Sequence, residues 1–139
     1  MHAEVEQTVH MGTVADVERT AIRAIYEIHK EVAGLMKSGV LAHMLYEAAH
    51  RGFEDHGYKD YLPGRIGHAI GLSNHEDFSI SASSLSVLMP DTIIALEPHI
   101  QIPGVCATQF SDTILITAEG HKFLTSPPND AELEIKPPI

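Results

Sequence analysis

The chain has 139 residues and a formal net charge of −10, from 9 Lys and Arg against 19 Asp and Glu. This length supports one domain or a piece of a larger one, and 44% hydrophobic residues suit a globular protein. The negative charge repels phosphate backbones and anionic membrane surfaces, so neither nucleic acid nor a membrane is an expected partner.

Targeting signals are not evident in the sequence. No apolar run approaches the ~20 residues of a membrane span. Met1 is followed by His2, Glu4 and Glu6 rather than by a basic and then apolar signal peptide, so a cytoplasmic protein is expected. The single cysteine, Cys106, excludes an intramolecular disulfide and is expected to be a small buried residue.

The first half of the chain predicts one strand and two helices. Residues 2–11 alternate apolar and polar side chains, which is typical of a strand. Thr13 followed by Asp16 resembles a capping box and predicts a helix to about Lys37. A second helix is predicted over residues 41–56, with apolar residues on one face.

The second half changes to a β pattern with turns. Strands are predicted over four segments, 67–72, 92–102, 105–110 and 113–117. The order of a strand, two helices and then antiparallel strands predicts an α+β domain. We assign this domain to residues 1–125 and a proline-rich C-terminal tail to residues 126–139.

A glycine-bracketed segment carries two histidines, His68 and His75, seven residues apart (75 − 68). Gly67 and Gly71 permit close backbone approach or a positive φ around His68. An imidazole held by a strand can bind a metal or donate a hydrogen bond to a polar transition state. A structural histidine with satisfied hydrogen bonds is the alternative.

Glu97 follows an apolar run and precedes Pro98. A carboxylate in such a place is costly to bury unless it is paired, protonated or bound to a metal. Proline ends regular strand pairing, which can aim the neighbouring side chain. Glu97 is therefore a candidate site residue, and an exposed strand end is the alternative.

Other polar residues are weaker candidates. Glu4 and Glu6 would share one strand face, where they can bind a cation, act as an acid–base pair, or simply face water. Asp112 lies between two predicted strands and is interpreted as a turn residue. Five histidines in polar stretches of the sequence are interpreted as solvated or helix-capping residues: His29, His43, His50, His56 and His121.

Taken in order, these segments resemble the pita-bread family of creatinase, prolidase and the Xaa-Pro and methionine aminopeptidases. The family's Gly-His-Gly-Ile-Gly-x-x-x-His-Glu stretch is similar to residues 67–76, with Ala69 for the middle glycine. Its Glu-Pro-x-Ile is similar to residues 97–100, and its Ser-Asp-x-Thr-Arg-Thr strand to residues 3–8. The resemblance implies a partial pita-bread fold over residues 2–125, with two helices packed on a curved antiparallel sheet.

The resemblance also implies a metal site. In the family's peptidases, two Asp, one His and two Glu hold two divalent cations, usually Mn, Co or Zn, which activate a water for attack on a peptide bond. His68 matches the metal histidine, and Glu97 matches a metal glutamate that also shuttles protons. Glu4 stands at the position of the second metal Asp, and His75 matches the histidine that contacts the substrate.

Two ligand positions depart from this pattern. The last metal Glu is replaced by Ser111, and the first metal Asp would lie upstream of Met1. The resemblance therefore implies an incomplete metal site in a hydrolase of the Xaa-Pro dipeptidase or aminopeptidase P type, acting on small peptides.

Two other functions remain open. A creatinase-like enzyme would hydrolyse a C–N bond of a small amide or guanidino compound without metal, using His68, His75, Glu97 and Glu6. A module derived from the fold would bind peptides without catalysis. Whichever function holds, the strand at the start would expose an unpaired edge, so a homo-oligomer is expected.

Overall fold

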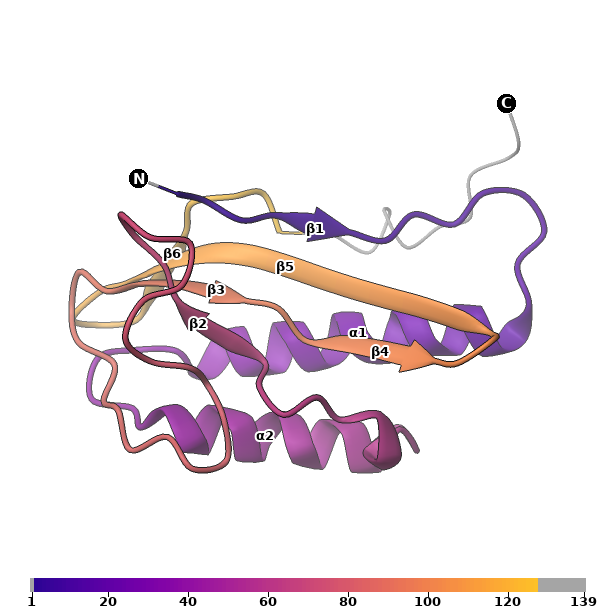
Figure 1. Cartoon of the computed structure of the whole chain (residues 1–139), viewed down its shortest axis with the longest axis horizontal. Coiled ribbons are helices and arrows are strands. Elements are labelled where there is room, and N and C mark those ends of the chain that lie inside the picture. The colour runs from indigo at the N-terminus through magenta and orange to yellow at the C-terminus, as the bar shows by residue number, and fades with distance from the viewer. Residues whose placement is uncertain (1, 128–139) are drawn as a thin grey trace.

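Two helices pack side by side against one face of an antiparallel sheet (Figure 1). The computed structural model describes residues 2–127. The helices are α1 (Asp16–Leu35) and α2 (Ala42–Asp55), followed by a short 3-10 turn, η1 (Lys59–Tyr61). Within residues 2–127, no helix is long and apolar enough to cross a membrane.

The sheet is organised around one long strand, β5 (Cys106–Ile116). Its neighbours are β1 (Glu6–Gln7) on one side and β3 (Ile93–Leu96) on the other, and β2 (Gly67–Ala69) lies beyond β3. Two further strands pair with β5 near its ends, β4 (His99–Ile102) and β6 (His121–Phe123). All of these pairings are antiparallel, and together with the two helices they confirm the α+β prediction.

The helix predictions are accurate to within three residues, because each helix buries a periodic apolar face in the core. The expected capping box at Thr13 is wrong. The helix begins after Ala15, whose backbone N–H donates to Glu18 Oε2 at 2.8 Å. At the helix contact, a Cβ on Gly52 would lie 2.8 Å from Ile28 Cγ1, so this glycine permits the close approach.

The first predicted strand, residues 2–11, is mostly irregular, and only Glu6 and Gln7 pair regularly. The Thr8 side chain explains part of this difference. Its hydroxyl donates to the Gln109 carbonyl at 3.1 Å and accepts from the Gln109 N–H at 2.9 Å, so it takes the place of main-chain pairing. The strand lies at the outer end of the sheet order, and self-association through this edge stays a prediction.

Two strand predictions in the second half differ from the structure. The segment 92–102 forms two strands separated at Glu97 and Pro98, as expected from the proline. The segments 105–110 and 113–117 form the single strand β5, so the interpretation of Asp112 as a turn residue is wrong. Asp112 is completely buried in the middle of β5.

A buried polar contact explains how Asp112 is accommodated. Thr125 Oγ1 donates to Asp112 Oδ1, and His29 Nε2 from α1 lies 3.3 Å from Asp112 Oδ2. His29 is 2% exposed, which corrects its interpretation as a solvated histidine. Burial lowers the pKa of His29 to about 4 and raises that of Asp112, so both groups are shifted toward their neutral forms. We therefore regard the contact as a neutral imidazole facing a carboxyl group, rather than as an ion pair.

Gly67 is needed where β2 passes close to β3. A Cβ at this position would lie 2.6 Å from the Ala95 carbonyl oxygen and 3.0 Å from Ile80 Cδ1. We expect Gly67→Ala to lower the free energy of unfolding by about 1–3 kcal/mol, the usual cost of overpacking. Urea unfolding measures this change. Gly34→Ala is the control because no atom lies within 4 Å of its Cβ, and an equal loss in both variants would contradict the steric argument.

Candidate metal centre

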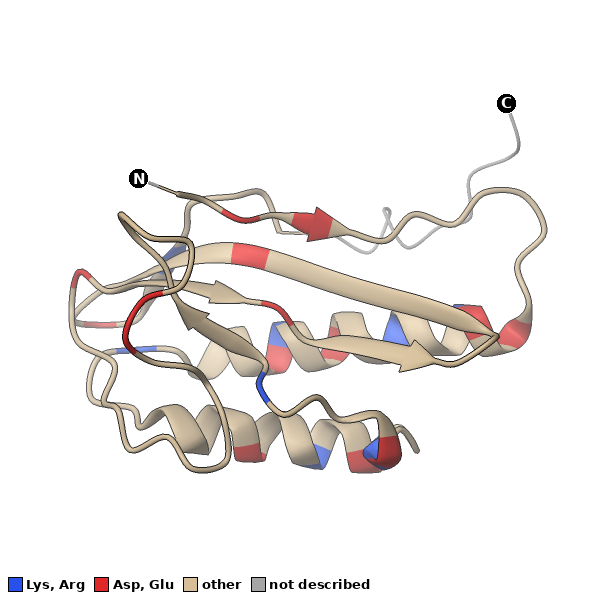
Figure 2. Cartoon of the chain, in the orientation of Figure 1, with Lys and Arg blue, Asp and Glu red and all other residues tan. Residues whose placement is uncertain are grey.

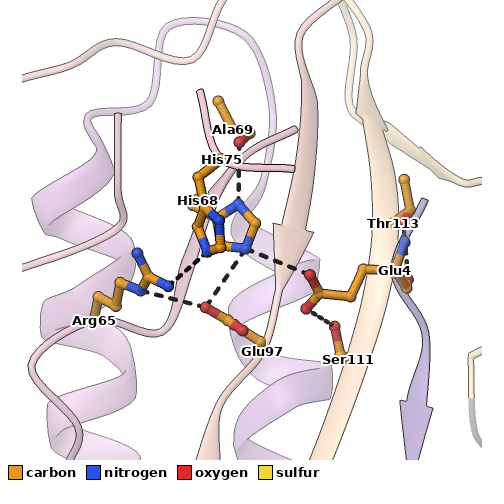
Figure 3. Close-up of polar contacts among 8 residues, drawn as sticks. All are labelled: Glu4, Arg65, His68, Ala69, His75, Glu97, Ser111 and Thr113. Atoms are coloured by element: carbon orange, nitrogen blue, oxygen red, sulfur yellow. Dashed lines mark hydrogen bonds and ion pairs between the residues drawn. The ribbon is translucent and has the colours of Figure 1, made fainter. Parts of the chain in front are cut away.

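Three side chains from different parts of the chain converge beside the sheet (Figure 3). His68 lies on β2, opposite Ala95 of β3, and Glu97 follows the end of β3. Glu4 precedes β1, where its backbone is tied to the Thr113 hydroxyl by two hydrogen bonds of 2.7 and 2.8 Å. One ligand atom from each of the three residues lies within 4.8 Å of the others.

The orientation of the His68 ring is set by its hydrogen bond. The Nδ1–H donates to the Ala69 carbonyl at 3.0 Å, so Nε2 carries the lone pair. Nε2 faces Glu4 Oε2 at 3.5 Å and Glu97 Oε1 at 3.7 Å, and it has no hydrogen-bond partner among residues 2–127. His68 is 1% exposed, so this unpartnered atom is also shielded from water.

The charge of Glu4 disfavours the charged form of the Glu97 carboxyl group. The pKa of Glu97 is raised, first by burial and then by the nearby charge of Glu4, while His68 and Arg65 act in the opposite direction. Nε2 of His68 and one oxygen of each glutamate therefore face one another, and the Nε of Arg65 lies beside them, 3.5 Å from Glu97 Oε1. A divalent cation satisfies the three acceptor atoms, and one imidazole with two carboxylates is a donor set found at such sites. The residues present thus fit a metal.

Ser111 and Glu6 lie differently from the three converging residues. Ser111 is buried, and its hydroxyl donates to Glu4 Oε1 at 2.8 Å, so this residue orients a candidate ligand. Glu6 is exposed and enters none of the ion pairs and hydrogen bonds found among the described side chains. Of the two neighbouring glutamates, Glu4 is the one that reaches His68.

His75 lies over His68, with 4.1 Å between the ring centroids. It is carried by the irregular segment after β2, and its Nε2 is 2.8 Å from Arg65 Nη2. The pKa of His75 is lowered, chiefly because protonation of both His75 and His68 would bring two positive charges together, then by desolvation and by the charge of Arg65. A lowered pKa favours the neutral ring, which can both accept and donate hydrogen bonds.

Arg65 is a site residue that sequence reasoning missed. Besides contacting His75, its Nε lies 3.5 Å from Glu97 Oε1 (Figure 3). It also lines an open pocket of about 660 Å³ next to Glu97, together with polar side chains that include Ser79, His99 and Gln109. The only signal in the sequence is a lone arginine three residues before His68 (68 − 65), with no motif of its own.

Charge elsewhere on the chain does not mark a second site. Acidic residues are spread over both helices, the sheet and the loops (Figure 2). Among residues 2–127, the Glu4, His68 and Glu97 cluster is the one group of three or more His, Cys, Asp or Glu close enough to hold a metal.

Comparisons with known proteins identify the family and the fold of the chain. An uncharacterized peptidase of Staphylococcus epidermidis is 31% identical over 123 residues, which is 88% of this chain and 35% of the relative. The prolidase from Pyrococcus furiosus superposes with a TM-score of 0.87 at 31% identity, over 91% of this chain and 38% of that one. An Xaa-Pro dipeptidase from Bacillus anthracis superposes with a TM-score of 0.87 at 26% identity, over 96% of this chain and 36% of that one.

The chain thus spans about a third of the length of the relatives it matches. The likeness to these prolidase structures confirms the pita-bread fold predicted from the sequence motifs. The family match covers residues 1–118, most of the chain. The protein belongs to metallopeptidase family M24.

Proposed function

We propose that this chain contributes the metal site of a peptidase that cleaves small peptides of the Xaa-Pro type. The unpartnered Nε2 of His68, buried and facing two carboxylates, is the observation that carries the proposal. The prolidase and Xaa-Pro dipeptidase relatives support the substrate class. The chain spans about a third of the length of those proteins, so the peptidase activity is proposed here and does not follow from the likeness itself.

Glu4, His68 and Glu97 would together hold a single divalent cation such as Mn, Co or Zn. When bound, the cation supplies a Lewis acid that lowers the pKa of water and polarises a carbonyl group. The replacement of a carboxylate by Ser111 leaves fewer ligands than the paired cations of the family require, and Ser111 instead holds Glu4 in place. One cation is therefore the expected stoichiometry.

The remaining steps fall to side chains around this cluster. Glu97 is placed to take up a proton and return it to the leaving nitrogen, the role implied by its motif. His75 is stacked on His68 and can donate an N–H to the oxygen of the scissile carbonyl. The pocket beside Glu97 is open and lined mainly by polar side chains, so it provides hydrogen-bond partners for the polar atoms of a peptide.

Metal analysis combined with hydrolysis tests this function. We expect purified protein to bind one equivalent of Mn, Co or Zn and to release proline from Xaa-Pro dipeptides, with activity lost in EDTA and restored by the metal. Hydrolysis of a guanidino compound that survives EDTA would instead support the creatinase-like alternative. Peptide binding without hydrolysis, in protein that carries its cation, would support the binding module and contradict the enzyme.

A further inference from the structure

Arg65 joins two residues of the site that would otherwise not contact each other through hydrogen bonds. Its Nη2 is 2.8 Å from His75 Nε2, and its Nε is 3.5 Å from Glu97 Oε1. The side chain is 45% exposed, so it belongs to the wall of the open pocket rather than to the core.

The contact with His75 has a defined direction. A guanidinium group has only donors, so Arg65 donates and His75 Nε2 accepts. A neutral imidazole carries one proton, which must then be on Nδ1. Arg65 therefore determines which nitrogen of His75 is left to donate.

His75 needs such a partner because its position is otherwise weakly held. It is exposed and lies in the irregular segment between β2 and β3, beyond the regular pairing of the sheet. The hydrogen bond from Arg65 is the one described for its side chain among residues 2–127, and its ring also packs against the ring of His68. Removing the guanidinium would free the ring to rotate and to change tautomer.

We propose that Arg65 is a positioning residue that holds His75 as the Nδ1–H tautomer over His68, an inference that rests on the proposed peptidase function. In this state the single N–H of His75 is available to a substrate oxygen. The contact of Arg65 with Glu97 places the same guanidinium between the hydrogen-bond donor and the proton-accepting carboxylate. Lysine would not replace it well, because a single ammonium lacks the fork that reaches two partners.

The tautomer can be measured without substrate or metal. We would label the histidine nitrogens with ¹⁵N, remove metal with EDTA, and record long-range ¹H–¹⁵N spectra well above the ordinary histidine pKa of about 6.5. The expected result for the wild type is a protonated Nδ1 and an unprotonated Nε2 on His75. A protonated Nε2 in the wild type would overturn the proposal without any variant being made.

Variants then test whether Arg65 is the cause. Arg65→Met removes every donor and should give His75 a mixture of both tautomers, and guanidinium ion added at millimolar concentration should restore the Nδ1–H form. Arg51→Met is the matched control, since Arg51 is exposed on α2. A tautomer that is unchanged in a folded Arg65→Met protein would also overturn the proposal.

Kinetics separate this inference from the function on which it rests. In an active enzyme, Arg65→Met should lower kcat at full metal occupancy, and Arg65→Lys should recover only part of the loss. An unaltered kcat would show that the tautomer has no role in turnover. If the wild type never hydrolyses peptides but shows the expected tautomer, the proposed peptidase fails and the positioning of His75 by Arg65 stands.

Discussion

A Glu97→Gln variant is expected to lose its divalent cation while it keeps its fold. The amide oxygen of glutamine is neutral, so the cluster would retain one imidazole and one carboxylate from the present set. Replacing residues that merely orient ligands costs about 10–100-fold in metal affinity, and removal of a ligand should cost more than ~100-fold. Isothermal titration of metal-free protein with Mn, Co or Zn measures the change.

The same variant should behave differently without metal. Burial and the charge of Glu4 raise the pKa of Glu97, so a neutral side chain removes a repulsion that the metal-free wild type suffers. We therefore expect metal-free Glu97→Gln to be at least as thermally stable as metal-free wild type. Added metal should raise the Tm of the wild type alone, because a ligand that binds the native state stabilises it.

Two further variants are compared with Glu97→Gln for their metal affinity. Glu119→Gln makes the same chemical change on an exposed turn and should leave metal affinity unchanged. Ser111→Ala removes the hydroxyl that donates to Glu4 and should weaken binding by about 10–100-fold. Full cation stoichiometry and unaltered affinity in Glu97→Gln would remove Glu97 from the ligand set and contradict the proposed site.

The helices and the chain order of the fold could be predicted from the sequence because the signals are local. Apolar residues at helical spacing report the buried face of α1 and α2, and Pro98 reports the break between β3 and β4. The continuity of β5 could not be predicted, because a charged residue between two apolar runs usually marks a turn. Inside the strand, Asp112 accepts a hydrogen bond from Thr125 and faces His29, which lies 83 residues away in the sequence (112 − 29).

The candidate site also combines residues that local sequence motifs predict with residues that only the folded structure reveals. His68 and Glu97 stand in recognisable motifs, and their convergence with Glu4 follows once the strand order is known. Arg65 stands in no motif, and its role depends on two distances that only the folded chain provides. The choice between Glu4 and Glu6 likewise depends on the short, irregular pairing of the first strand, which alternation of residues alone does not reveal.

Acidification should unfold this protein partly through His29, whose pKa burial lowers from 6.5 to about 4. Below pH 6.5, His29 becomes protonated in the unfolded state, whereas in the folded state it stays neutral until about pH 4. The contribution of neutral His29 to the free energy of unfolding is therefore complete above pH 6.5 and is lost as the pH falls toward 4. This difference between the pKa values of His29 in the unfolded and folded states corresponds to about 3 kcal/mol of unfolding free energy.

His29→Gln isolates this contribution. The raised pKa of Asp112 acts in the opposite direction, since a carboxyl group that protonates more readily when folded gains stability as the pH falls. Because Asp112 is present in both proteins, the difference between their urea unfolding curves across pH reports mainly His29. The wild type should lose stability more steeply than His29→Gln between pH 6.5 and 4, whereas His2→Gln, changed at an exposed site, should follow the wild type. Parallel curves for wild type and His29→Gln would show that His29 is protonated inside the folded protein as readily as in water, which its 2% exposure argues against.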